Sequence, residues 1–291
     1  MSEDPLKRAM GLPCWTAPES AELLGGGITN VNVQLRDGGR EFVVRLGADI
    51  PVHGVMRWNE LAISRAAQAA GVAPAVHYAE PGALALDFIA GRTFSEADVR
   101  DDANLHRIIA LLKSAHRGVQ HHLRGPALTF WVFHVLRDYA ATLRRDSSRH
   151  VGRLTDLLET AAILEEAVGP IDLVLGHNDL LAGNLIDDGE RLWLIDWEYA
   201  GFNSPLFDLG GLATNNGLSE AQELAMLEQY FDAPAAPRWR AYSAMKCASL
   251  LRETMWSMTS EIHSELDFDY AAYTEENLAR FEAALADFRQ S

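Results

Sequence analysis

The spacing of apolar residues changes near residue 91, and this change constrains the fold more than any other feature. In residues 31–46, apolar and polar side chains alternate on both sides of Asp37-Gly38-Gly39, which predicts a β-hairpin. Residues 58–71 are rich in helix formers and end at Gly71, a residue typical of helix C-termini. Two further short strands, residues 73–80 and 83–91, are expected around a Pro81-Gly82 turn.

Beyond residue 91 the periodicity is mostly helical. Residues 103–117, 129–145 and 151–168 predict helices. Residues 171–197 interrupt them with two short apolar runs joined by an Asp-Asp-Gly-Glu turn, and helices are expected again from about Ser219 to the end. We therefore predict an α+β fold with two lobes. Residues 1–90 would form a small β-rich N-terminal lobe, and residues 91–291 a larger, mostly helical C-terminal lobe.

Composition narrows the classes of partner. The formal net charge of −16 argues against nucleic acid as a ligand, because such binding relies on Lys and Arg neutralising phosphates. Cys14 and Cys247 are the only cysteines, which fits a reducing cytoplasm and predicts neither a disulfide nor a zinc site. No secretory signal and no apolar run of the roughly 20 residues that span a bilayer is visible. We expect a cytoplasmic protein without a membrane partner; no pattern indicates an oligomeric state.

Three polar residues carry the main chemical signal. In HNDLLAGN, Asp179 precedes Asn184 by the spacing of a kinase catalytic loop, in which a base comes first and a metal-binding amide second. Asp196 follows the next apolar run, and a hairpin between the two segments would bring its carboxylate beside the amide. Mg²⁺ prefers such hard oxygen ligands. The spacing predicts phosphoryl transfer, with Asp179 as base and Asn184 and Asp196 as Mg²⁺ ligands.

These residues lie in segments that resemble a known family. HNDLLAGN, IDWEYA and PLFDLG are similar to motifs of the choline and ethanolamine kinase branch of the aminoglycoside phosphotransferase and protein-kinase-like superfamily. The resemblance covers roughly residues 20 to 260. It implies a protein-kinase-like fold that binds ATP between its lobes with Mg²⁺. The γ-phosphate would go to the hydroxyl of a small amino alcohol, with choline or ethanolamine the first candidates.

The resemblance also assigns roles by position. His177 would brace the catalytic loop, and Asp208 would support that loop from behind. Arg45 is similar to the phosphate-contacting basic residue, for which protein kinases use lysine, and Glu60 would be its ion-pair partner. The other nucleotide-binding candidates belong to the glycine-rich loop or to the hinge between the lobes: Gly26, Gly27, Thr29, Asn30, Asp87, Phe88 and Ile89.

The acceptor pocket is less well specified. A cationic acceptor is stabilised over an aromatic face, and the resemblance points to Tyr199 and Trp256, with Glu198 adding negative charge. Residues 211–219, however, lack the aromatic and acidic residues that choline kinases of higher organisms share. Thiamine or an aminoglycoside therefore stays open as the acceptor. A non-catalytic kinase-like binding protein is the alternative of another class, and its expected mark, loss of the base or of a metal ligand, is not present.

Overall fold

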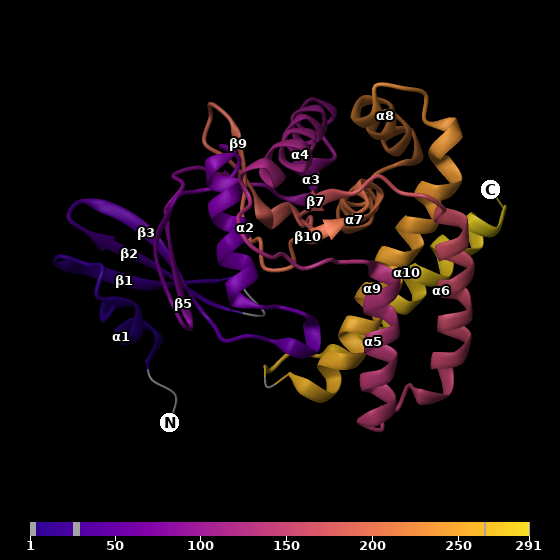
Figure 1. The fold of residues 1–291 in the computed structure, drawn as a ribbon, viewed down its shortest axis with the longest axis horizontal. Helices are drawn as coiled ribbons and strands as arrows, with labels where there is room; N and C mark the ends of the chain where they lie inside the picture. Colours follow the sequence, from indigo (N-terminus) through magenta and orange to yellow (C-terminus); the bar gives the residue numbers. More distant parts are fainter. Residues whose placement is uncertain (1–3, 26–29, 265, 291) are drawn as a thin grey trace.

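The computed structural model describes residues 4–25, 30–264 and 266–290, which form the two expected lobes (Figure 1). The N-terminal lobe is built on a five-stranded antiparallel sheet in the order β1-β2-β3-β5-β4. Its strands are β1 (Pro18–Leu24), β2 (Val31–Asp37), β3 (Arg40–Leu46), β4 (Val76–Glu80) and β5 (Ala83–Asp87). Its helices are α1 (Pro5–Met10), the 3₁₀ turn η1 (Pro51–His53) and α2 (Arg57–Ala69).

The predicted elements of this lobe are confirmed. β2 and β3 form the hairpin. Its turn residues Gly38 and Gly39 have φ of +57° and +74°, values that residues other than glycine rarely adopt. Helix α1 and strand β1 were not predicted. α1 is only 6 residues long, and β1 lies at the sheet edge, where partial exposure on both faces leaves no clear alternation.

One face of the sheet is covered by α1, and the other faces α2 and the second lobe. Val33, Phe42 and Val44 pack with Ala9 of α1 into a small apolar core. Because side chains alternate along a strand, Arg45 must point to the opposite face, toward α2 and the second lobe. The strand period thus places a cation between the lobes.

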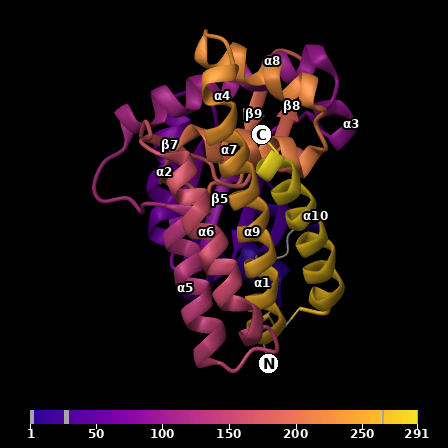
Figure 2. The same cartoon turned by 90° about the vertical axis from the view of Figure 1, so that its right-hand side faces the viewer.

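The C-terminal lobe surrounds a long central helix, α9 (Trp239–His263), which packs against its neighbours α5, α6, α7 and α10 (Figure 2). The other helical elements are α3 (Glu96–Val99), α4 (Asp102–His122), α5 (Val132–Arg145), η2 (Val151–Arg153), α6 (Leu154–Val168), α7 (Pro205–Asn216), α8 (Glu220–Phe231), η4 (Ala236–Arg238) and α10 (Tyr270–Gln290). Within the described residues, no helix combines the length and apolarity needed to cross a bilayer.

The expectation that helices resume only at Ser219 is wrong, because α7 begins at Pro205. The Ser204 side chain caps its first turn, and Gly217 ends it with φ of +65°. Gly210 and Gly211 weaken the helical pattern of this segment, but Gly210 permits close packing: a Cβ there would lie 3.0 Å from the Lys246 Cα of α9. Tertiary packing outweighs local propensity here.

Short strands flank the two segments that carry Asp179 and Asp196. The predicted hairpin is confirmed as β8 (Leu185–Asp187) and β9 (Leu192–Leu194), joined at its edge by β6 (Arg92–Thr93). A second pair consists of β7 (Val174–Gly176) and β10 (Gly201–Asn203). The catalytic segment, residues 177–184 including the 3₁₀ turn η3 (Ala182–Asn184), runs from β7 to β8, and the segment with Asp196 runs from β9 to β10. Both segments are therefore anchored at each end.

Candidate active site

The catalytic loop is held from behind by one buried carboxylate. Asp208, in the first turn of α7, accepts hydrogen bonds from the backbone N–H groups of His177, at 2.7 Å, and Asn178, at 2.6 Å. It also accepts one from Nε2 of His116 on α4, at 2.7 Å. These contacts place Asp208 where the predicted supporting role requires it. The role itself stays a prediction.

Two residues of this support were not predicted. Asn178 has φ of +67°, and its side chain donates to the carbonyl oxygen of Tyr199 at 3.0 Å and accepts from Asn203 at 3.0 Å. The loop is thereby tied to the segment that follows Asp196. His116 is 1% exposed, and its Nδ1 lies 2.7 Å from the Tyr230 hydroxyl. The only feature of the sequence that could have indicated this role of His116 is its place on the apolar side of a predicted helix.

His177 connects the catalytic loop to the chain just before Asp196. Its Nε2 lies 2.8 Å from the carbonyl oxygen of Ile195, and its ring meets Trp197 edge-on at 4.9 Å. Within the described chain its buried Nδ1 has no hydrogen-bond partner. Burial lowers the pKa of His177 although Asp208 is close, which favours a neutral ring. The residue lies where a bracing role would place it.

Backbone contacts connect the segments that carry Asp179, Asn184 and Asp196. The Asn184 amide nitrogen donates to the carbonyl oxygen of Asp179 at 2.9 Å, a bond that does not use its side-chain oxygen; the predicted role of that oxygen as a metal ligand stays a prediction. The Ile195 N–H donates to the carbonyl oxygen of Asn184 at 3.0 Å and aligns the two segments. Asp196 itself has φ of +66°, a conformation that aspartate tolerates better than most residues.

The pKa of Asp179 is raised to about 8. Burial is the main cause; the negative charges of Asp196, Glu253 and Glu198 add to it, and the positive charge of Arg252 opposes it. A carboxyl group whose pKa lies near the working pH is suited to accept a proton during a reaction.

Arg45 joins the two lobes. Its Nε lies 3.0 Å from Glu60, and its Nη2 lies 2.5 Å from Asp196 and 3.5 Å from Glu198. Arg57 adds a second cation, with Nη1 2.7 Å from Glu60 and 2.9 Å from Glu198. Burial would raise the pKa of Asp196, but the charge and hydrogen bond of Arg45 outweigh it and lower this pKa. The pair that sequence predicted, Arg45 and Glu60, is thus part of a five-membered charge cluster.

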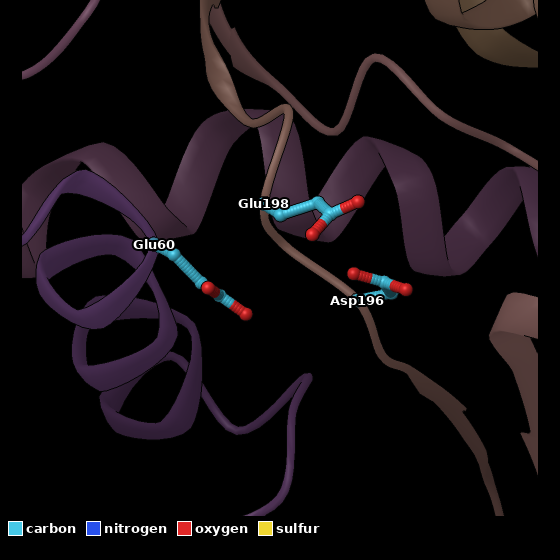
Figure 3. Close-up of side chains that lie close together, drawn as sticks. All are labelled: Glu60, Asp196 and Glu198. Atoms are coloured by element: carbon cyan, nitrogen blue, oxygen red, sulfur yellow. The ribbon is translucent and has the colours of Figure 1, made fainter. Parts of the chain in front are cut away.

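The three carboxylates of this cluster converge, as Figure 3 shows for Glu60 on α2 and for Asp196 and Glu198 on the segment after β9. Each offers an oxygen within 4.8 Å of the others, a donor set that suits Mg²⁺. Glu198, predicted for the acceptor, lies instead beside the two arginines and accepts a hydrogen bond from Asn30 at 2.7 Å. The nucleotide-binding candidate Asn30 is thus in the cluster, whereas Gly26, Gly27 and Thr29 fall outside the described residues.

The predicted hinge lies at the end of β5. Asp87 accepts a hydrogen bond from Arg40 at 2.9 Å, and the N–H of Phe88 donates to the carbonyl oxygen of Glu41 at 3.1 Å. Asp87, Phe88 and Ile89 line a cleft between β5, the end of α2 and the β8–β9 hairpin. The Phe88 contact continues the pairing of β5 with β3 and holds the start of the hinge to the sheet; the contact of the hinge with adenine stays a prediction.

The acceptor candidates Tyr199 and Trp256 contact each other. The Trp256 Nε1 donates to the Tyr199 hydroxyl at 3.0 Å, and both side chains are buried. The guanidinium of Arg252 lies over the Tyr199 ring, 4.5 Å from its centre. Arg252 also donates to Glu253 at 2.8 Å, and Glu253 accepts from the Tyr273 hydroxyl at 2.8 Å. Neither Arg252 nor Glu253 was predicted; their signal was a charged pair inside an apolar helix.

The fold has the two lobes of a protein-kinase-like phosphotransferase, with Arg45 paired to Glu60 and with Asp208 bonded to the loop that carries Asp179 and Asn184. The chain belongs to the phosphotransferase enzyme family, whose family model matches residues 20–245. It is therefore an enzyme, and the alcohol-directed phosphotransferase chemistry of its relatives agrees with the predicted class.

Individual relatives agree with this assignment. The protein LicA of Haemophilus influenzae is 26% identical over 89% of this chain and 77% of its own length. Ethanolamine kinase 2 of Rattus norvegicus is 28% identical over 75% of this chain and 63% of its own length. Among solved structures, a choline/ethanolamine kinase family protein from Mesorhizobium loti matches with a TM-score of 0.77 and 27% identity, covering 96% of this chain and 92% of that one.

Proposed function

We propose that this protein is an ATP-dependent kinase that transfers the γ-phosphate to the hydroxyl of a small amino alcohol, with choline and ethanolamine as the first candidates. One set of contacts carries the proposal: the Asn184 amide is bonded to the backbone of Asp179, the Ile195 N–H is bonded to the backbone of Asn184, and the adjacent Asp196 pairs with Arg45 of the other lobe. The acceptor class is supported by the names of the relatives, which are choline and ethanolamine kinases.

Asp179 would accept the hydrogen bond of the substrate hydroxyl and take its proton as the oxygen attacks the γ-phosphorus. Arg45 and Arg57 supply positive charge on the nucleotide side, and both are fixed by Glu60. Asn184 and Asp196 would hold Mg²⁺, and Glu198 has an oxygen within 4.8 Å of one on Asp196. When bound, Mg²⁺ neutralises charge on the phosphate oxygens.

Replacing Asp179 with Asn tests the central assignment. The amide keeps the shape of the side chain but cannot take the proton, so turnover should fall by about 10²–10⁴-fold. The affinity for Mg-ATP, measured by calorimetry, should change little because Asp179 lies on the acceptor side. Asp172→Asn, at an exposed position, is the matched control. Near-normal turnover of Asp179→Asn would refute the role of this residue.

The acceptor is tested by ADP release with choline, ethanolamine, thiamine and an aminoglycoside. Turnover with one of the first two supports the proposal, and turnover with only thiamine or the aminoglycoside redirects it. Failure of Mg-ATP to bind would instead favour a non-catalytic kinase-like protein.

A further inference from the structure

Arg252 is a buried cation with unused hydrogen-bonding capacity. Its side chain is 6% exposed, and its Nη1 donates to Glu253 at 2.8 Å. In the part of the chain that the structure describes, its Nε and Nη2 have no partner, although both atoms are out of contact with solvent. Buried donors on a charged group are costly to leave unpaired, so a ligand is the natural partner for these two.

The two unpaired atoms form one edge of the guanidinium. A planar carboxylate binds this kind of edge through two parallel N–H···O bonds, a geometry that lysine cannot provide. The Cζ atom of the same guanidinium lies over the rings of Tyr199, at 4.5 Å, and Phe130, at 5.6 Å. These cation–π contacts hold the guanidinium in place without using the N–H groups of the edge.

Arg252 belongs to the pocket that also contains Asp179. Asp179, Arg252 and Glu253 line a single pocket between the catalytic loop, α7 and α9, together with Thr214 and Asn215. Arg252 lowers the pKa of Asp179 and Glu253 raises it, so both lie close enough to interact electrostatically with this carboxyl group. Among the described residues, however, Arg252 forms an ion pair with Glu253 only. One cation and one anion therefore flank the base.

This arrangement suits a quaternary ammonium poorly. Such a group binds over an aromatic face, but Arg252 already covers that of Tyr199 and carries like charge. A molecule with both charges fits better, because a carboxylate can take the edge of Arg252 while an ammonium group approaches Glu253.

From these contacts we infer that the acceptor is a hydroxy amino acid, whose carboxylate binds the Nε–Nη2 edge of Arg252 and whose ammonium faces Glu253. Its hydroxyl oxygen forms the new bond to the γ-phosphorus, the bond from that phosphorus to the β–γ bridging oxygen breaks, and ADP leaves. The hydroxyl proton passes to Asp179. The inference rests on the kinase chemistry of the proposed function, and it replaces choline and ethanolamine, the first candidates there, with amino alcohols that also carry a carboxylate.

Pairs of acceptors that differ only in the carboxylate provide the test. Ethanolamine pairs with L-serine, 1-amino-2-propanol with L-threonine, and 3-amino-1-propanol with L-homoserine. In the wild-type enzyme, kcat/KM for at least one amino acid should exceed that of its partner by about tenfold or more, the effect of hydrogen bonds to a charged group. ADP release gives the rate, and mass spectrometry identifies the phosphorylated product.

Variants then assign the preference to Arg252. Arg252→Met keeps an unbranched apolar side chain but removes the guanidinium, so it should abolish the preference for the amino acid. Arg252→Lys keeps the positive charge but lacks the paired N–H groups, so it should retain only part of the preference. Arg137→Met, which breaks an exposed ion pair with Glu165 on α6, should leave the preference unchanged. Thermal unfolding shows whether each variant is folded. If Arg252→Met does not fold, the inference is tested by the acceptor pairs in the wild-type enzyme and by Arg252→Lys.

The outcomes separate this inference from the proposed function. If only the amino alcohols are phosphorylated, the proposed function stands and the carboxylate site is refuted. If Arg252→Met lowers kcat/KM equally for both members of each pair, Arg252 acts on the phosphoryl group or on the fold, and the inference is also overturned. If no member of either series is phosphorylated, both proposals fail.

Discussion

Replacing Asp208 with Asn should both destabilise the protein and disable its catalytic loop. The carboxylate accepts three buried hydrogen bonds, two at Oδ2 from His177 and His116 and one at Oδ1 from Asn178. An asparagine has one acceptor oxygen. If that oxygen keeps the two bonds at the Oδ2 position, the amide NH₂ meets the N–H of Asn178, and two donors face each other.

The magnitude follows from these contacts. A hydrogen bond to a charged group contributes about 1.5–3 kcal/mol, and a buried donor left without a partner costs about 1–3 kcal/mol. We therefore expect the free energy of unfolding to fall by about 3–5 kcal/mol, as when one partner of a buried ion pair is removed. Because His177 and Asn178 precede Asp179 directly, a shift of the loop by about 1 Å should lower kcat about 10²-fold.

The effect should also depend on pH. Burial alone raises the pKa of Asp208, but the hydrogen bond and charge of His116, together with His177, outweigh it and hold this pKa below its ordinary value. The stabilisation is thus present above the unfolded-state pKa of about 3.9 and is lost as the pH falls through the lower folded-state pKa. The stability difference between wild type and Asp208→Asn should shrink in acid.

Urea unfolding, followed by circular dichroism, and ADP release measure the two effects. The control is Asp232→Asn, which breaks a surface ion pair with Lys113 in which Asp232 is 72% exposed. Such pairs contribute about 0–1 kcal/mol. Equal stability of the two variants, with kcat unchanged in Asp208→Asn, would refute the reasoning.

Two further predictions concern the acceptor side. Because the pKa of Asp179 is raised to about 8, kcat/KM should rise with pH as this carboxyl group loses its proton and level off above that value; a flat profile on both sides of pH 8 would contradict the assignment. Trp256→Phe removes the hydrogen bond to the buried Tyr199 hydroxyl and should lower the free energy of unfolding by about 1–3 kcal/mol in urea titrations, whereas an unchanged midpoint would show that this bond is dispensable.

Local sequence patterns were sufficient to predict the elements that form from residues close together in the chain. The β2–β3 hairpin, helix α2 and the β8–β9 hairpin follow from apolar spacing and turn residues. The order of Asp179, Asn184 and Asp196 predicted a catalytic segment, and the β8–β9 hairpin between Asn184 and Asp196 folds the chain back as that prediction requires. Sequence reasoning missed α7, whose glycines weaken the local signal and are needed only for packing against α9.

By itself, then, the sequence determined the class of enzyme, because the residues that predict its chemistry follow one another at short spacing in a single stretch of chain. Tertiary structure decided what surrounds that site. It turned Glu198 toward Arg45 and Arg57 rather than toward the acceptor. It also brought Arg252 and Glu253 on α9 to the pocket of Asp179, many residues earlier in the chain. The packing of α9 against α7 places them there, and no local pattern encodes a contact between segments so far apart.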